Sequence, residues 1–280
     1  MCIRDRFKAA GLPTDREAVS ALWPTWQDYI ETGKKFAAGT TGKAKFLDSA
    51  TNTYNSILMQ TAGATTGYTY FDRSGEFVME SNPAIKTAWD TTNQVLTSGL
   101  SSNLKSFTNE WNAGFKSGAF ATIACPAWMT GYIEGQAGEA GAGKWDIASV
   151  PGGGGNWGGA FLAVPKQSKN QAVAVDLAKF LSSPSSQLAA FKAVGNFPSS
   201  PEIHASAELK ADKNEYFSEA PVGDIFAKGA ASLKPVYLGA KNQPVRDAIE
   251  NDLRAVEQGK LSAAEGWTRA VKDAKAAAGV

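Results

Sequence analysis

The sequence predicts an α/β fold, and three observations support this. The short apolar run 160–164 follows a cluster of glycines and is closed by Pro165, as is typical of a buried strand. After the polar KQSKN break, the apolar residues of 173–181 recur at spacings of four, three and one, which places them on one face of a helix. A second apolar helical repeat closes the chain over 263–275. Strand, break and helix in this order form half of a βαβ unit.

Length, charge and composition restrict the class of protein. With 280 residues and 43% hydrophobic side chains, the chain can build one large domain or two modest ones. A net charge of +1 gives no electrostatic reason to expect nucleic acid or an anionic membrane as a partner. No stretch approaches eighteen consecutive apolar residues, so no transmembrane helix is predicted.

Catalytic and cofactor motifs are weak in this sequence. Gly153, Gly155 and Gly158 fit the spacing GxGxxG, but these glycines open a strand, whereas a dinucleotide fingerprint follows one. The single histidine, His204, has no GxSxG partner motif and is expected on the surface. Cys125 follows an apolar run and is expected to be a lone buried thiol. We therefore predict no catalytic residue, no metal site and no cofactor.

The N-terminal hexapeptide MCIRDR has no apolar core and cannot serve as a signal peptide. We expect residues 1–6, which include Cys2, to be a non-native tail, with a short native tail as the alternative. After it, Asp15 can cap a short helix that ends near Pro24. Thr25 then caps a second helix, with Asp28 in the capping-box position.

Residues 46–48 can form a short strand that leads into the polar stretch SATNTYN. Asn52, Tyr54 and Asn55 are expected in a loop before a helix around 57–60. Amides and a phenol at a strand-to-helix turn suit a neutral, hydroxyl-rich ligand, because they offer donors and acceptors without full charge. An ordinary polar helix cap is the alternative.

Tryptophans near a predicted strand end are the candidates for a ligand platform. The apolar run 119–125 predicts a strand, and Trp128 follows it in a turn, where ligands collect on open α/β sheets. Sugar rings present an apolar C–H face that stacks on indole. Trp111 and Trp157 compete for the same role, whereas Trp145 is expected to pack in the core. Charged residues are scarce near the three candidates, which favours an uncharged ligand.

Two stretches resemble one family. The order VPGGGG…GGAFLAVPKQSKNQAVAVDLAKFLSSP…GNFPSSPE and the block FTNEWNAGFKSGAFATIACPAWMTGYIEG are similar to the sugar-binding group (family 1) of the extracellular solute-binding proteins of ABC importers. The resemblance covers nearly the whole chain from Phe7 onward. The stretch YFSEAPVGDIF…LKPVYLGAKN looks most similar to actinobacterial binders of cello-oligosaccharides and related β-glucosides. It implies an α/β fold like that of type II periplasmic binding proteins.

The resemblance also implies how the chain divides between two lobes. Residues 7–144 and 185–280 are expected to form the C-terminal lobe, and 145–184 a return segment of an N-terminal lobe that is largely missing from an N-terminally truncated chain. Five apolar side chains of the return segment should then be exposed: Ile147, Phe161, Leu162, Phe180 and Leu181.

The family's cleft adds further site residues. There the loop of Asn52 faces the cleft, and a strip equivalent to Tyr237, Asn242 and Gln243 crosses its floor. The alternative is that the strip is a plain loop between two helices and that its residues do not contact a ligand. The implied function is to bind an oligosaccharide without catalysis and deliver it to ABC transporter permease subunits.

The resemblance implies that the protein is a monomer. It implies a location either at the extracellular face of the cell membrane, held by a lipid anchor, or in the periplasm. Two alternatives stay open. One is a carbohydrate-active enzyme, such as a glycoside hydrolase, that draws on Asp48, Glu110 and Asp224. The other is a fragment that no longer binds.

Overall fold

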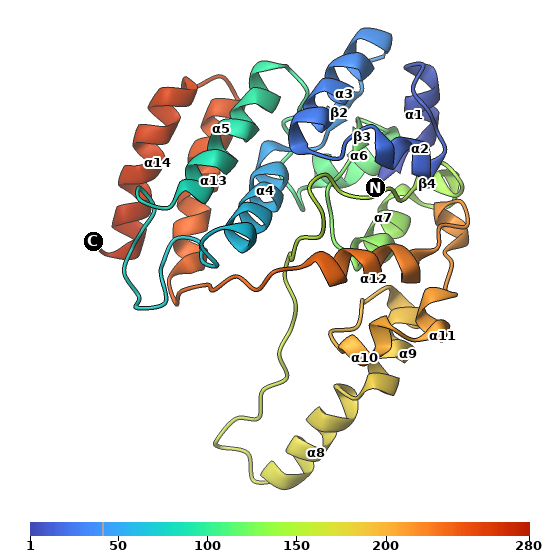
Figure 1. The fold of residues 1–280 in the computed structure, drawn as a ribbon, viewed down its shortest axis with the longest axis vertical. Coiled ribbons are helices and arrows are strands. Elements are labelled where there is room, and N and C mark those ends of the chain that lie inside the picture. The colour runs from blue at the N-terminus through green and yellow to red at the C-terminus, as the bar shows by residue number, and fades with distance from the viewer. Residues whose placement is uncertain (41) are drawn as a thin grey trace.

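The computed structural model describes residues 1–40 and 42–280, apart from the side chain of Cys2. Figure 1 shows a helical body with one long excursion. The helices before the excursion are α1 (Arg4–Ala9), α2 (Arg16–Ala21), α3 (Trp26–Gly39), α4 (Ala50–Ala64), α5 (Pro83–Thr97), α6 (Asn109–Ser117), α7 (Met129–Ala137) and the 3-10 turn η1 (Glu139–Gly141). Those from the excursion onward are α8 (Gln171–Leu181), α9 (Pro184–Val194), α10 (Pro201–His204), α11 (Ala207–Lys210), η2 (Glu215–Phe217), α12 (Val222–Ser232), α13 (Asn242–Glu257) and α14 (Ala263–Ala278).

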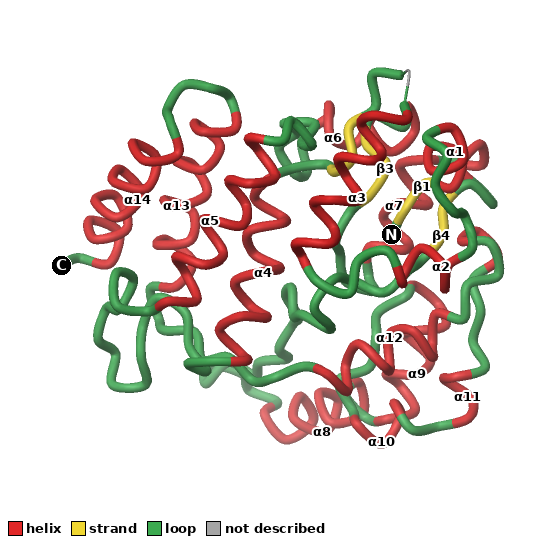
Figure 2. The backbone as a smooth tube through the Cα atoms, turned by 45° about the horizontal axis from the view of Figure 1, so that its top comes forward, coloured by secondary structure: helices red, strands yellow, loops and turns green. Residues whose placement is uncertain are grey.

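A small four-stranded sheet lies inside the helical body, on the side opposite α13 and α14 (Figure 2). Its strands are β1 (Cys2–Ile3), β2 (Lys45–Leu47), β3 (Phe120–Thr122) and β4 (Trp145–Asp146), in the order β2-β3-β1-β4. β2 runs parallel to β3, and β1 pairs antiparallel with both β3 and β4. The hexapeptide expected to be a tail thus supplies an inner strand of the sheet.

The predicted capping of the first helices is confirmed. The Asp15 side chain accepts hydrogen bonds from two backbone amides of α2. Thr25 and Asp28 form the reciprocal capping box of α3. Trp26 on this helix is buried, and its indole Nε1 donates to Oε1 of Gln60 at 2.7 Å.

Two hydrophobic cores hold the body together. The first lies among α3, α4, α5, α13 and α14, where the rings of Trp89 and Trp267 pack with their centroids 5.5 Å apart. The second lies among β3, β4, α6 and α7, where Trp111 and Trp145 are buried. The expected packing role of Trp145 is confirmed, because only 1% of the residue is exposed.

The predicted loop before α4 is wrong. Ser49 caps the helix by accepting a hydrogen bond from the amide of Asn52, and α4 begins at Ala50. Asn52, Tyr54 and Asn55 therefore lie within the helix, seven residues earlier than the apolar pattern indicated. The serine cap overrides the weak helix propensity of the polar stretch that follows it.

The run 160–164, predicted to be a buried strand, is an exposed connection without strand pairing. The run leads to α8, so the helix predicted over 173–181 is confirmed. This helix projects away from the body (Figure 1). The predicted exposure of five apolar side chains within residues 145–184 is confirmed at four positions: Phe161 (99%), Leu162 (57%), Phe180 (66%) and Leu181 (47%). The prediction is wrong for Ile147, which is 2% exposed because it follows β4 into the second core. A strand needs a neighbour for its amides and carbonyls, and no described segment pairs with 160–164.

Candidate ligand-binding groove

A groove of about 760 Å³ opens beside the carboxyl end of β3. Its walls come from α2, from the start of α3, from the segments that leave β3 and β4, and from α12. The glycine-rich segment, residues 151–159, closes another side. These elements are far apart in the sequence, so the groove is a product of the tertiary fold.

Trp128 and Trp157 meet in this groove. Trp128 is the residue before α7, and Trp157 belongs to the glycine-rich segment. Their ring centroids are 5.8 Å apart at an interplanar angle of 60°. The indole Nε1 of Trp128 donates to the backbone oxygen of Trp157 at 3.3 Å. Both side chains remain partly exposed, so the groove has two adjacent aromatic surfaces.

Gln60 of α4 fixes the start of the glycine-rich segment. Its Nε2 donates to the carbonyl oxygens of Pro151 at 2.9 Å and Gly153 at 2.6 Å. The amide of Gly154 donates to Oγ of Ser232 on α12 at 2.7 Å. A Cβ atom on Gly154 would lie 2.0 Å from the carbonyl oxygen of Gly229, so only glycine allows this approach.

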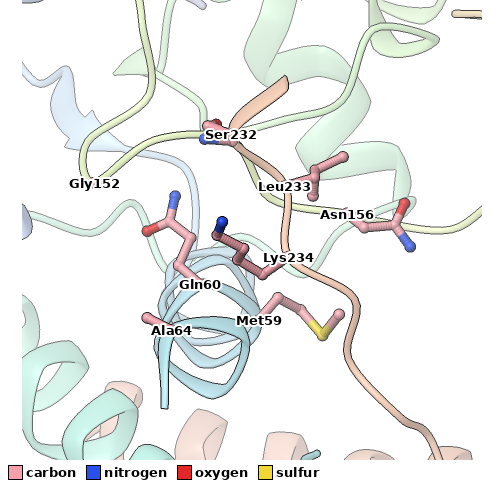
Figure 3. A pocket seen from close by; sticks show the side chains of 9 residues that line it. Met59, Gln60, Ala64, Gly152, Asn156, Ser232, Leu233 and Lys234 are labelled. Atoms are coloured by element: carbon pink, nitrogen blue, oxygen red, sulfur yellow. Dashed lines mark hydrogen bonds between the residues drawn. The ribbon is translucent and has the colours of Figure 1, made fainter. Parts of the chain in front are cut away.

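A smaller cavity of about 290 Å³ lies next to the groove and shares Gly154, Asn156, Ser232 and Leu233 with it. Figure 3 shows Gln60 and Lys234 close together below the turn at Gly152. The glycine-rich segment thus contributes to both hollows.

Charges in the groove are balanced. Two basic and two acidic side chains line it: Arg16, Lys228, Glu17 and Asp224. Nζ of Lys228 lies 2.7 Å from a carboxylate oxygen of Asp224, and this hydrogen bond raises the pKa of Lys228. Arg16 pairs with the buried Asp146 at 3.0 Å. Three of these four charges are thus already in ion pairs, which gives the groove no strong preference for an ionic ligand.

The thiol and the imidazole of this region also line the groove. Burial raises the pKa of Cys125 to about 11, so the thiol is neutral at physiological pH. Nε2 of His204 is 2.6 Å from the carbonyl oxygen of Pro198, and the ring stacks on Phe197. The histidine expected on the surface is therefore half-buried and packed.

Trp111 and Asn52 do not line the groove. Trp111 is fully buried, and its Nε1 donates to Oδ2 of Asp48 at 2.9 Å. Asn52, 5% exposed, donates to the same oxygen at 2.5 Å. Burial raises the pKa of Asp48 to about 7 despite these bonds. In this conformation both predicted site residues support a buried carboxyl group and leave almost no surface for a ligand.

The strip 237–243 is also separate from the groove lining. The amide of Tyr237 donates to Gly67, and Oδ1 of Asn242 accepts from Thr69 at 2.6 Å. Gln243 is exposed and donates to an aspartate of its own helix. Of the seven predicted site residues, only Trp128 and Trp157 line the groove.

Sequence reasoning missed Phe107, whose ring lies 6.5 Å from Trp128 and 6.3 Å from Trp157, measured between centroids. It stands in a polar stretch without periodicity, so no sequence signal marks it. Among the described residues, no group of three or more His, Cys, Asp or Glu side chains has the arrangement of a metal site. No described helix has the length and apolar character needed to cross a bilayer.

The sequence profile of the family described as "Bacterial extracellular solute-binding protein" matches residues 5–217. The chain belongs to this family. A solved structure of an "Extracellular solute-binding protein family 1" is 37% identical, with a TM-score of 0.89 over 99% of this chain and 70% of that one. This likeness confirms the predicted fold of the periplasmic-binding-protein type.

Two further relatives carry ligand names. An ABC transporter associated binding protein from B. animalis subsp. lactis Bl-04, solved in complex with β-1,6-galactobiose, has a TM-score of 0.76 at 18% identity, over 99% of this chain and 70% of that one. The lactose-binding protein of Rhizobium radiobacter is 28% identical over 127 residues, which make up 45% of this chain. The match spans only 28% of that protein's length.

Proposed function

We propose that this solute-binding protein holds a neutral oligosaccharide in the aromatic groove and releases it unchanged. The observation that carries this proposal is the meeting of Trp128 and Trp157 in a groove of about 760 Å³. Indole faces suit the C–H faces of sugar rings, and the groove is within the size range of small-molecule sites. Backbone carbonyls and amides of the glycine-rich segment supply hydrogen bonds for the sugar hydroxyls.

The charge balance of the groove supports an uncharged ligand. Because Lys228 is paired with Asp224 and Arg16 with Asp146, an ionic ligand would have to compete with existing ion pairs. A neutral saccharide avoids this competition. The ligand names of the two relatives, lactose and β-1,6-galactobiose, are of the same chemical class.

The partner and the setting follow from the family. The family is extracellular by its description, and one relative is named as associated with an ABC transporter. We infer that the liganded protein, as a monomer, meets the permease subunits of an ABC importer, either lipid-anchored outside the cell or in the periplasm. Residues 145–184 then form an excursion into a second lobe, and closure of two lobes on the sugar provides the signal.

Glycoside hydrolysis is the less favoured function. A hydrolase needs two carboxyl groups that face one cleft. Of the three carboxylates considered from the sequence, Asp48 is buried, Glu110 is exposed outside the groove lining, and Asp224 lines the groove, where Glu17 is a second carboxylate. Asp224 is also held in an ion pair. This arrangement favours binding without bond cleavage.

Incubation of the 280-residue chain with labelled oligosaccharides tests the proposal. Retention of intact sugar on the protein, without new reducing ends, is the expected result. Cleavage of the sugar without stable retention would overturn the binding function. Addition of excess unlabelled sugar should displace the label, which distinguishes specific retention from trapping.

A further inference from the structure

Phe107 lies outside the groove lining but next to Trp128 and Trp157, and it is unusual because its large apolar ring is left 52% exposed amid other aromatic rings. It is nearly parallel to Trp128, with an interplanar angle of 16°. On its other sides it contacts Tyr132 at 5.7 Å and Trp111 at 5.1 Å between centroids. The ring is therefore supported by neighbours while about half of the residue faces solvent.

The backbone of Phe107 is strained. Its φ angle of 65° lies in the left-handed region, which bulky residues rarely occupy. Such strain persists only where the surroundings fix it, and it is concentrated at ligand sites. An ordinary loop residue would relax to a negative φ and could turn the ring elsewhere.

The surroundings that fix this loop belong to the buried cluster around Asp48. Oγ of Ser106 donates to Oδ1 of Asn52 at 3.2 Å, and Asn52 in turn donates to Asp48. The amide of Leu104 donates to the backbone oxygen of Asp48 at 3.3 Å. The side chain of Asn52 and the backbone carbonyl of Asp48 thus hold the loop from within and place the ring of Phe107 beside Trp128.

We propose that Phe107 is a third ligand-contacting ring and that it favours saccharides of two or more rings over single sugars. This inference rests on the proposed sugar-binding function. The centroids of Phe107, Trp128 and Trp157 are separated by 5.8 to 6.5 Å and define a triangle of faces. A single pyranose that stacks on one tryptophan does not cover all three faces. A longer chain reaches Phe107 and removes its exposed surface from water.

Calorimetry with the 280-residue chain and its Phe107→Ala variant tests the proposal. Glucose and galactose serve as single-ring probes, and lactose, cellobiose and cellotriose as longer ones. Loss of the contact with the exposed half of a phenylalanine should lower the affinity for the longer probes by about 3- to 12-fold. Affinity for the single sugars should stay unchanged, and Phe107→Tyr should retain tight binding because it keeps the ring.

Phe180→Ala on α8 is the matched control, because it removes a ring that is 66% exposed but that, unlike Phe107, has no ring contact with Trp128 or Trp157. It should leave every affinity unchanged. Equal losses for single and longer sugars, or no loss at all in Phe107→Ala, would overturn the role of Phe107. If Phe107→Ala loses no affinity but Trp128→Ala abolishes binding, the role of Phe107 is overturned while the proposed function stands. Absence of heat with every probe in the unaltered chain would instead overturn both.

Discussion

Replacement of Asp48 by asparagine should remove a pH dependence from the stability of this protein. Asp48 is 1% exposed, and its Oδ2 accepts hydrogen bonds from Trp111 and Asn52. Burial raises its pKa from an ordinary value of 3.8 to about 7. The folded protein therefore keeps this proton over a pH range in which the unfolded chain has lost it.

The sign and size of the effect follow from proton linkage. Where the folded state binds more protons than the unfolded state, stability falls as the pH rises. The contribution of Asp48 is present in full below pH 3.8 and disappears as the pH rises through 7. Integration between pH 5 and pH 8 gives a loss of about 2.5 kcal/mol in the free energy of unfolding.

Urea denaturation at pH 5, 6, 7 and 8, followed by tryptophan fluorescence, measures this loss. The Asp48→Asn variant is the control, because it keeps a side-chain oxygen for Trp111 and Asn52 but cannot titrate. Other groups titrate equally in both proteins, so the difference between the two profiles isolates Asp48. Parallel profiles over this range would refute the reasoning.

Two further predictions concern glycine packing and the exposed excursion. Gly223→Ala should lower the free energy of unfolding by about 1 to 3 kcal/mol, because its Cβ would lie 1.6 Å from the carbonyl oxygen of Leu209. A Cβ atom on Gly229, in the same helix, would meet nothing within 4 Å, so Gly229→Ala should leave the free energy of unfolding unchanged or raise it by up to about 1 kcal/mol. Urea titrations of both variants measure these changes. An equal loss of stability in the two variants would contradict the close packing at Gly223. The double variant Leu177→Ser with Phe180→Ser on α8 should bind less of an apolar fluorescent dye, because both side chains are exposed. It should change the free energy of unfolding by less than about 0.5 kcal/mol. A large loss of stability would show that this face of α8 is packed.

Elements with local signals were predictable from the sequence. The capping box of Thr25 and Asp28 is complete within four residues, and the structure contains it. The helical repeat that became α8 is equally local. Trp128 and Trp157 could also be named, because each follows a recognisable motif, although their meeting depends on the fold.

Features that depend on distant partners could not be predicted. The run 160–164 has strand composition but no described strand beside it, so it stays extended and exposed. Cys2–Ile3 has no strand signal, yet it pairs with β3 and β4 across more than one hundred residues. Phe107 acquires its position from a buried hydrogen-bond network and a strained backbone, and neither leaves a mark in the sequence.

Isothermal titration of lactose and cellotriose into the unaltered chain and into Trp128→Ala tests the central claim most directly. Heat of saturable binding in the unaltered chain is expected, with at least about a 10-fold loss of affinity when the indole of Trp128 is removed from the groove. No heat with any saccharide, or equal affinity in the two proteins, would contradict an aromatic sugar site in this groove.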